Sequence, residues 1–448
     1  MRTSRAPWQL VAMVVLVALS GCGGSGGDAG GPTPTPVATP TAAPTPSASP
    51  SPFVIVAGVA GDTFPEVAFA ADRYLATFSQ PGPGGGRDVY GVRFASSSGV
   101  LDAEPLLLSD LDPGVSDLAG ASYEGSSVAG GAGFGVFFAG YGSLSDSGVP
   151  AQVVGFSSVP PSGPPIRPAT LVDSQISFSM VQTSITGVTA ATGSGQRSTG
   201  LYGRGTTAAF QPIFIGQVDG ADVLAGDGAV TVDDTYVLGA GGVVDGVLHS
   251  AGNGSIASAG PIQLAVWFDA AIDTSRPAPP MVRTITLAGA QRTPAGVIPL
   301  TLADVPDEPG GTAVGSDGAA FLVAWSVATV STNPPNEIRA LRYRAGDDGA
   351  PGSVDPPGGF LVADGPSAKT VVGVAHAAGT WLVAWLDEGI LHGARIPADG
   401  TTVAPFTIFP DNVNAAALTT DGARFLVVAE HPTEPSIDLI GFFVPAAD

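Results

Sequence analysis

The chain has 448 residues, a formal charge of −22 at pH 7, 63 glycines and 41 prolines. A surface with so few cations cannot neutralise phosphates, which excludes nucleic acid as a partner. The hydrophobic fraction of 44% comes in short runs that can bury a core, and helical spacing of apolar residues is not sustained after the N-terminal run. The composition therefore predicts an all-β body with many tight turns.

Residues 1–21 are predicted to be a signal peptide. Arg2 and Arg5 precede an apolar run from Trp8 to Leu19, which is too short to cross a hydrocarbon core of roughly 30 Å. The run ends in Leu-Ser-Gly-Cys, which resembles the lipobox of bacterial lipoproteins, in which the cysteine is lipidated and becomes the first mature residue. Cys22 is the only cysteine and has no partner for an intramolecular disulfide. We expect Cys22 to be the lipid attachment site; the alternative is an ordinary secretory peptide with an incidental cysteine.

Residues 22–52 are predicted to be a lipidated cysteine followed by a disordered stalk. Gly23 begins a glycine-rich stretch, and a tract of Pro, Thr, Ser and Ala follows up to Pro52. Such a tract favours the polyproline II conformation and contains no apolar run that could bury surface. We expect it to hold the body away from the membrane.

The rest of the chain, residues 53–448, repeats a pattern of four short apolar runs separated by turn-forming clusters. The clearest unit is Val371–Asp411, in which the turns are Ala-Ala-Gly, Asp-Glu-Gly and Pro-Ala-Asp-Gly. This is the pattern of a four-stranded antiparallel unit, and about 40–50 residues is the size of one propeller blade. Pro65–Asp110, Thr312–Asp364 and the segment from Val413 onward repeat it, with second runs that read Tyr-Leu-Ala-Thr-Phe, Phe-Leu-Val-Ala-Trp and Phe-Leu-Val-Val-Ala.

The middle of the body repeats the pattern less clearly. Units can be traced at 117–173, 177–219, 221–260 and 261–305, and the last two each lack one clear strand. The count is eight units, or seven if the span 221–305 forms a single one. We therefore expect one β-propeller of seven or eight four-stranded blades.

The two ends of the body predict how the ring closes. The last unit has three runs, the third of them Ile437–Val444, and stops before a fourth. Phe53–Val56 is an isolated run that precedes the first complete unit. An open ring would leave an unpaired sheet edge, so we expect this N-terminal strand to complete the last blade beside Ile437–Val444.

The units resemble repeats found in secreted and lipid-anchored bacterial proteins. In that pattern a Leu-Val-Val-Trp strand is followed by Asp-Ile-Tyr-Gly-Ala-Arg-Val, an Asp-Gly turn and Val-Leu-Asp; here Leu391–Ile396 is one of the third runs that carry it. The resemblance touches most of Pro65–Asp448 and is close in four units. It implies a β-propeller on a cell surface and implies no common activity.

Aromatic and arginine residues recur at fixed places in the units. Trp267, Trp325 and Trp385 lie in second runs, where we expect packing between blades; a stacking platform for a sugar ring is the alternative. Arg93, Arg344 and Arg395 recur in third runs, and we expect structural ion pairs rather than a cluster that binds carboxylates.

Metal binding remains unassigned from the sequence. His249, His376, His392 and His431 are scattered over different units without the spacing of a zinc site. The acid-rich turns Ser109–Gly114 and Gly346–Gly349 could hold calcium through oxygen ligands, although Asp and Gly are also common in plain turns. Calcium is thus the one cofactor that the turns suggest.

Two turns are loosely similar to the Asp-box of sialidases. They are Gly315–Phe321 and Thr419–Phe425, and both lack the Thr-Trp ending of that motif. The assignment to sialidases is therefore rejected, and no catalytic or cofactor-binding residue is identified.

The sequence predicts a monomeric, lipid-anchored extracytoplasmic propeller that acts as a binding or scaffold module for a protein, a glycan or an envelope component; a passive surface or structural protein is a further possibility. The alternative is a glycan-directed hydrolase or lyase with paired carboxylates in the central funnel, but no pair can be chosen from the sequence. Gly23 directly after the cysteine favours the outer membrane or cell surface, with the periplasmic side as the alternative.

Overall fold

The computed structural model describes residues 50–447 except 62, 83–84, 96, 98, 112–117, 145–149, 177–183, 193–196, 206–212, 220–231, 238–241, 245–246, 274–280, 294–295, 306–308, 329–334 and 347–349; for most of 166–253 it describes the backbone alone. The chain divides into Met1–Pro46, which lies outside the described residues, and Ser47–Asp448, to which the description below refers. The predicted signal peptide, Cys22 and most of the stalk lie outside the described residues. Within those residues, no helix has the length and apolar character needed to cross a membrane.

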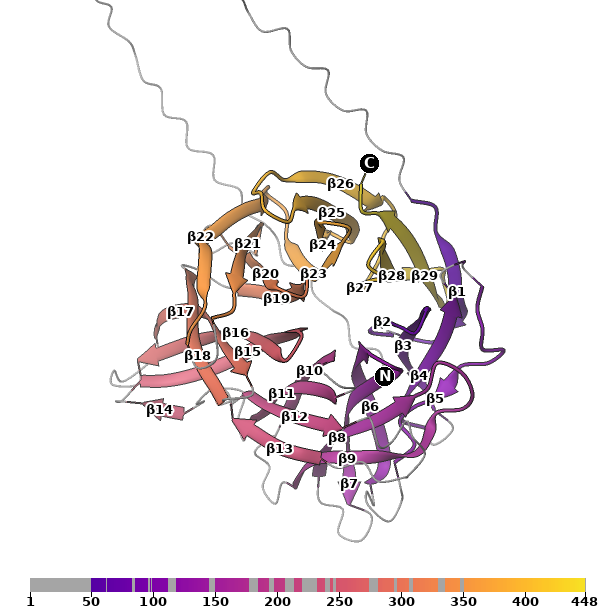
Figure 1. Cartoon of the computed structure of the whole chain (residues 1–448). Coiled ribbons are helices and arrows are strands. Elements are labelled where there is room, and N and C mark those ends of the chain that lie inside the picture. Colours follow the sequence, from indigo (N-terminus) through magenta and orange to yellow (C-terminus); the bar gives the residue numbers. More distant parts are fainter. Residues whose placement is uncertain are drawn as a thin grey trace, which may run out of the picture. The chain divides into compact units, whose positions relative to one another are not determined.

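The described residues form antiparallel sheets, six of which have four strands (Figure 1). The first sheet consists of β2 (Glu66–Ala70), β3 (Arg73–Pro81), β4 (Arg87–Ala95) and β5 (Leu106–Leu107). The second consists of β6 (Leu118–Gly130), β7 (Phe134–Leu144), β8 (Pro150–Val159) and β9 (Ile166–Ile176). The third consists of β10 (Ser184–Thr192), β11 (Arg197–Gly205), β12 (Ile213–Asp219) and β13 (Val232–Val237). The fourth four-stranded sheet consists of β19 (Pro309–Ser316), β20 (Ala320–Val327), β21 (Glu337–Arg344) and β22 (Ser353–Ala363). The fifth consists of β23 (Lys369–Ala377), β24 (Thr380–Asp387), β25 (Ile390–Pro397) and β26 (Ala404–Phe409). The sixth consists of β27 (Ala416–Thr420), β28 (Arg424–Pro432), β29 (Ile437–Pro445) and β1 (Phe53–Val59).

One further sheet has five strands. It consists of β14 (Gly242–Val244), β15 (Val247–Ala259), β16 (Ile262–Asp273), β17 (Met281–Thr293) and β18 (Gly296–Val305). The short strand β14 pairs with the start of β15, so it extends the sheet beside residues 247–249.

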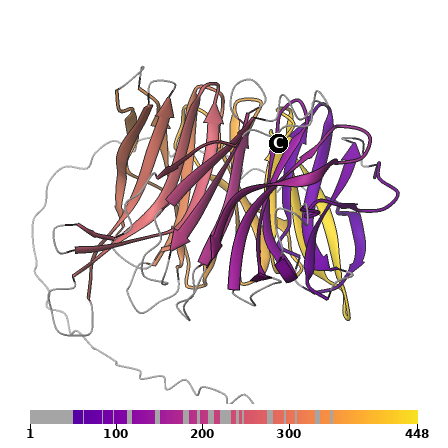
Figure 2. The same cartoon turned by 90° about the horizontal axis from the view of Figure 1, so that it is seen from below.

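The sheets are the blades of a β-propeller. Their innermost strands, β2, β6, β10, β15, β19, β23 and β27, lie beside one another in that order, and β27 lies beside β2. Figure 1 shows the sheets arranged around one axis, and Figure 2 shows their strands running along it. The all-β propeller predicted from the repeats is confirmed.

The prediction of seven or eight four-stranded blades is wrong, because six blades have four strands and the remaining sheet has five. The two units traced at 221–260 and 261–305 do not exist as separate blades. Strand β13 completes the sheet of β10–β12, and β15, β16 and β17 are 13, 12 and 13 residues long. Strands about twice the common length of 5–6 residues take up in one sheet the sequence that had been divided between two.

The predicted closure of the ring is confirmed. Strand β1 pairs antiparallel with β29, with Phe53 opposite Gly441 and Val56 opposite Leu439. A Cβ atom at position 441 would lie 2.5 Å from the Phe53 ring, so a glycine is needed where that ring is seated. This pairing covers the outer edge of β29, which would otherwise be exposed.

A buried carboxylate fixes the chain between β1 and β2. Glu430, which is 1% exposed, accepts hydrogen bonds from the backbone N–H and hydroxyl of Thr63 and from the backbone N–H of Phe64. Several donors on one carboxylate offset the cost of burying its charge. The last blade is thus joined to the segment that begins the first blade.

The core lies between neighbouring blades. Leucines at the same place in the second strands are fully buried; they are Leu75, Leu322, Leu382 and Leu426. One cluster joins Leu322 and Ala324 of β20 to Trp381 and Trp385 of β24. Because a blade is covered on both faces, its second strand is a continuous apolar run rather than an alternating one.

Candidate functional site

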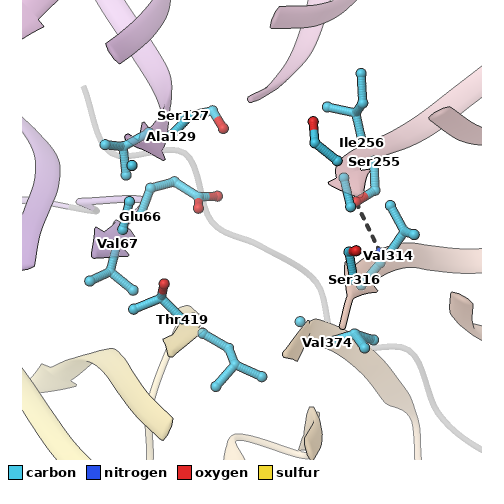
Figure 3. Close-up of a pocket in the computed structure, with 18 of the residues that line it drawn as sticks. Glu66, Val67, Ser127, Ala129, Ser255, Ile256, Val314, Ser316, Val374 and Thr419 are labelled. Carbon is cyan, nitrogen blue, oxygen red and sulfur yellow. Dashed lines mark hydrogen bonds between the residues drawn. The ribbon is translucent and has the colours of Figure 1, made fainter. Parts of the chain in front are cut away.

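The innermost strands surround a central cavity of about 490 Å³ (Figure 3). Its lining comes from β2, β6, β15, β19, β23 and β27. Each innermost strand is hydrogen-bonded within its blade on one side, so its other edge presents backbone N–H and C=O groups towards the axis. The backbone N–H of Val314 donates to the Ser255 hydroxyl oxygen at 3.2 Å, which joins β15 to β19 beside the cavity (the dashed line in Figure 3).

Hydroxyl and apolar residues both line this cavity. The hydroxyl groups belong to Ser127, Ser255, Ser258, Thr312, Ser316 and Thr419, and the larger apolar side chains to Val67, Phe69, Ile256, Val314, Val372, Val374 and Leu418. The surface that the lining presents to the cavity is mainly polar, because most of these apolar side chains are buried between blades.

Glu66 is the one charged residue among the described residues that line the cavity. The strand registers place it in one layer with five small residues on other innermost strands, namely Ser127, Ser255, Ala313, Gly373 and Ala417. Small neighbours leave room for the longer side chain of Glu66. Figure 3 shows Glu66 extending into the space between the strands.

The Glu66 carboxyl group is largely surrounded by protein and keeps only part of its solvent contact. It forms no hydrogen bond or ion pair with any residue that the structure describes. Burial therefore raises the pKa of Glu66 from 4.5 to about 8, because a low-dielectric environment disfavours the charged form. A titratable group with a strongly shifted pKa in a cavity is a candidate for binding or catalysis.

The predicted packing role of the tryptophans is confirmed. Trp325, Trp385 and Trp267 are 2%, 3% and 4% exposed. Trp385 also stacks on His392 with ring centroids 5.7 Å apart. Rings buried in this way offer no platform to a sugar, so that alternative is wrong.

Of the ion pairs predicted for the three arginines, the one at Arg93 is confirmed, and Arg395 forms a hydrogen bond to a backbone carbonyl. Arg93 of β4 is 5% exposed and forms an ion pair with Asp102, and Arg395 of β25 donates to the Pro445 carbonyl at 3.1 Å. Arg344 is exposed, so its assignment as a structural residue of this pattern is wrong. The equivalent residue is Arg342, which lies opposite Leu322 as Arg395 lies opposite Leu382.

These side chains connect each blade to the next. Arg93 donates to the Pro160 carbonyl at 2.8 Å, and Arg342 donates to the Pro397 carbonyl at 2.9 Å and to the Gly400 carbonyl. In each case the acceptor lies at the end of the third strand of the following blade or in the turn after it. Gln291 of β17 takes the same place and donates to the Ala350 carbonyl at 3.3 Å. The recurring arginines are therefore hydrogen-bond donors between blades.

The histidines do not form a metal site in the described part of the chain. His376 contacts Trp381, and His431 and Phe409 form a T-shaped ring pair, while the side chain of His249 lies outside what the structure describes. No group of three or more His, Cys, Asp or Glu residues that could hold a metal occurs among the described residues. Both acid-rich turns, 109–114 and 346–349, lie partly outside those residues, so calcium binding there stays a prediction.

The two turns similar to an Asp-box have a structural role. Asp421 accepts hydrogen bonds from the backbone N–H groups of Ala423 and Arg424 at 3.0 and 2.9 Å, and Asp317 accepts from the corresponding groups of Ala319 and Ala320 at 2.8 and 2.6 Å. Burial alone would raise the pKa of Asp421. The hydrogen bonds, including one from the Tyr74 hydroxyl, outweigh burial and lower this pKa. These aspartates stabilise β-hairpin turns.

Sequence reasoning missed Glu66. The available signal was an acidic residue inside the apolar first run Pro65–Ala70, where the equivalent positions in the other clear units are alanine or glycine. A charge at such a position requires a cavity or a partner. The sequence did not show which of these was present.

The blades around one axis and the cavity between them define the protein as a β-propeller. No protein-family model matches the chain, and no curated protein matches it. Among solved structures, the chain is similar to the β-propeller domain of the trilobed protease from Pyrococcus furiosus, with a TM-score of 0.45, 8% identity and coverage of 87% of this chain and 99% of that one.

Two further structures show comparable similarity. A protein of unknown function from Dyadobacter fermentans has a TM-score of 0.48 and 10% identity, over 89% of this chain and 98% of that chain. Trypanosoma rangeli sialidase has a TM-score of 0.40 and 10% identity, over 86% of this chain and 55% of that chain.

Proposed function

We propose that this protein is a binding module of the cell envelope, anchored by lipid on Cys22, that takes its ligand in the central cavity of the propeller. The observation that carries the proposal is the cavity lined by hydroxyl groups and containing one carboxyl group, Glu66. Such a lining offers hydroxyl, carboxyl and backbone groups that bind and orient a ligand through hydrogen bonds. The ligand is then a small molecule or the end of a larger envelope component.

Binding is favoured over hydrolysis by the composition of the lining. Glycoside hydrolysis commonly uses two carboxyl groups, about 5–10 Å apart, that flank the scissile bond. Glu66 is the one carboxyl group that the described lining presents. A single anchoring group suits recognition of a ligand.

A thermal-shift titration tests the proposal. The purified full chain is heated in the presence of a panel of sugars, amino acids, amines and dicarboxylates. We expect at least one class to raise the melting temperature, because a ligand at 100 times its Kd stabilises the folded state by about 2.7 kcal/mol.

Two variants locate the site. Thr419→Phe places a ring in the cavity and should abolish the shift, because Thr419 lines it. Thr402→Phe changes an exposed residue in the turn before β26 and should leave the shift unchanged. If no compound stabilises the protein, or if Thr419→Phe responds like the unmodified chain, the proposal is wrong.

A further inference from the structure

We propose that the ligand of the central cavity is a small organic cation, an alkylammonium ion or a linear diamine, with Glu66 as its counter-ion. This inference rests on the binding function proposed above and specifies its ligand class. It follows from the charge, the hydrogen-bonding groups and the apolar part of the lining of the cavity.

The charge of the cavity is unbalanced. Glu66 has no ion pair or hydrogen bond with the described residues, and the described lining contains no Lys, Arg or His. A buried carboxylate without a partner is costly, and a ligand that supplies the positive charge removes most of that cost. A neutral or anionic ligand would leave this charge unpaired or repel it.

The hydrogen-bonding groups favour a donor. An ammonium group has three N–H donors and no acceptor, so it needs several oxygens around it. Beside the Glu66 carboxylate, the lining offers the hydroxyl oxygens of Ser127 and Thr419 and the carbonyl groups on the free edges of the innermost strands. In Figure 3, Ser127 and Thr419 are drawn on either side of Glu66.

The apolar part of the lining is small, because the side chains of Val67, Ile256, Val314 and Val374 are 5–8% exposed, and it suits a short carbon chain between polar ends. Val67, Ile256, Val314, Val374 and Leu418 come from five different strands around the cavity. Methylene groups that leave water beside Leu418, which is partly exposed, are stabilised by the hydrophobic effect. The formal charge of −22 also attracts cations towards the protein at long range.

Isothermal titration calorimetry of the full chain in detergent at pH 8.5 tests the inference. The probes are 1,4-diaminobutane, its neutral analogue 1,4-butanediol and its anionic analogue succinate. We expect the diamine to bind at least about tenfold more tightly than the diol, because the pair formed with Glu66 is charge-assisted. Succinate should not bind measurably.

Three variants assign the effect to the carboxylate. Glu66→Gln should weaken diamine binding by at least about tenfold, whereas Glu66→Asp, which keeps the charge, should retain the preference for the diamine over the diol. The matched control is Glu104→Gln, the same chemical change at an exposed residue in the loop before β5, and it should alter the affinity by less than about twofold. Melting curves confirm that each variant is folded.

The outcomes separate this inference from the proposed function. Equal binding by the unmodified chain and Glu66→Gln overturns the role of Glu66. Binding of sugars or the diol in preference to the diamine overturns the ligand class and leaves the binding function standing. Failure of every compound in both titrations overturns the two proposals together.

Discussion

At the scale of single residues, Glu66 gives the stability of the protein a dependence on pH. Its pKa of about 8 lies above the ordinary value of 4.5, so between these values the folded state holds a proton that the unfolded state has lost. The free energy of unfolding therefore falls as pH rises through this window. Glu66→Gln removes the effect. At pH 9 the variant should be more stable than the unmodified chain by on the order of 2 kcal/mol, after discounting for residual solvent contact, and at pH 4 equally stable.

Urea denaturation at the two pH values measures this difference. Glu104→Gln serves as the control and should follow the unmodified chain at both, because Glu104 is exposed. A Glu66→Gln variant that gains nothing at pH 9 would show that the folded protein does not hold this proton.

Arg342 provides a second prediction at this scale. Its buried guanidinium donates to two carbonyl groups of the following blade, so Arg342→Met should lower the free energy of unfolding by about 2–3 kcal/mol, the worth of hydrogen bonds from a charged donor. Arg344→Met, two residues further along the same strand and exposed, should change it by less than about 0.5 kcal/mol. Chemical denaturation of both variants makes the comparison, and equal losses would contradict the assignment.

The candidate site shows where sequence reasoning ends. The role of the tryptophans followed from apolar runs, because large rings in such runs are normally packed. The choice between Arg342 and Arg344 depends on strand register, since both lie on the same face of β21 and only the pairing with Leu322 identifies the buried one. Glu66 is a candidate because strands that are far apart in the sequence surround it in the folded protein. A single sequence does not show which distant strands lie close together.

At the scale of elements, β1 is the strand that closes the ring, and Phe53 is one of its anchoring side chains, beside the buried Ile55 and Val59. The Phe53 ring stacks on Phe443 at 5.1 Å and meets the ring of Phe94 in the first blade at 5.9 Å. Phe53→Ala should lower the free energy of unfolding by about 2–3 kcal/mol, less than for a fully buried ring.

Val54 is the control on the same strand, because it is 52% exposed. Val54→Ala should cost less than about 0.5 kcal/mol, as measured by urea denaturation of both variants. If the two substitutions have the same effect, the Phe53 ring does not anchor β1.

The closure could be predicted because a missing strand at one end matched an extra strand at the other. The number of blades and of strands in each blade was predicted less accurately than the closure. Between residues 221 and 305 the strands consist largely of Gly, Ala, Ser, Thr and Val, and this composition does not mark where a long strand ends. The sheet of β14–β18 contains residues that strands of ordinary length would have divided between two blades.

At the scale of the whole molecule, the proposed lipid on Cys22 decides where the propeller acts. Acyl chains gain about 0.8 kcal/mol per buried CH₂, so several chains would hold the protein on a membrane.

Cys22→Ser should move the protein from the membrane fraction to the soluble fraction, as followed by fractionation and immunoblotting of cells that express the full chain. Ser20→Ala changes the neighbouring motif but keeps the cysteine, and it should stay with the membrane. The binding of small ligands should be equal in the two variants, because the residues described as lining the cavity lie between 66 and 419. Cys22→Ser protein that remains with the membrane would show that another part of the chain provides the anchor.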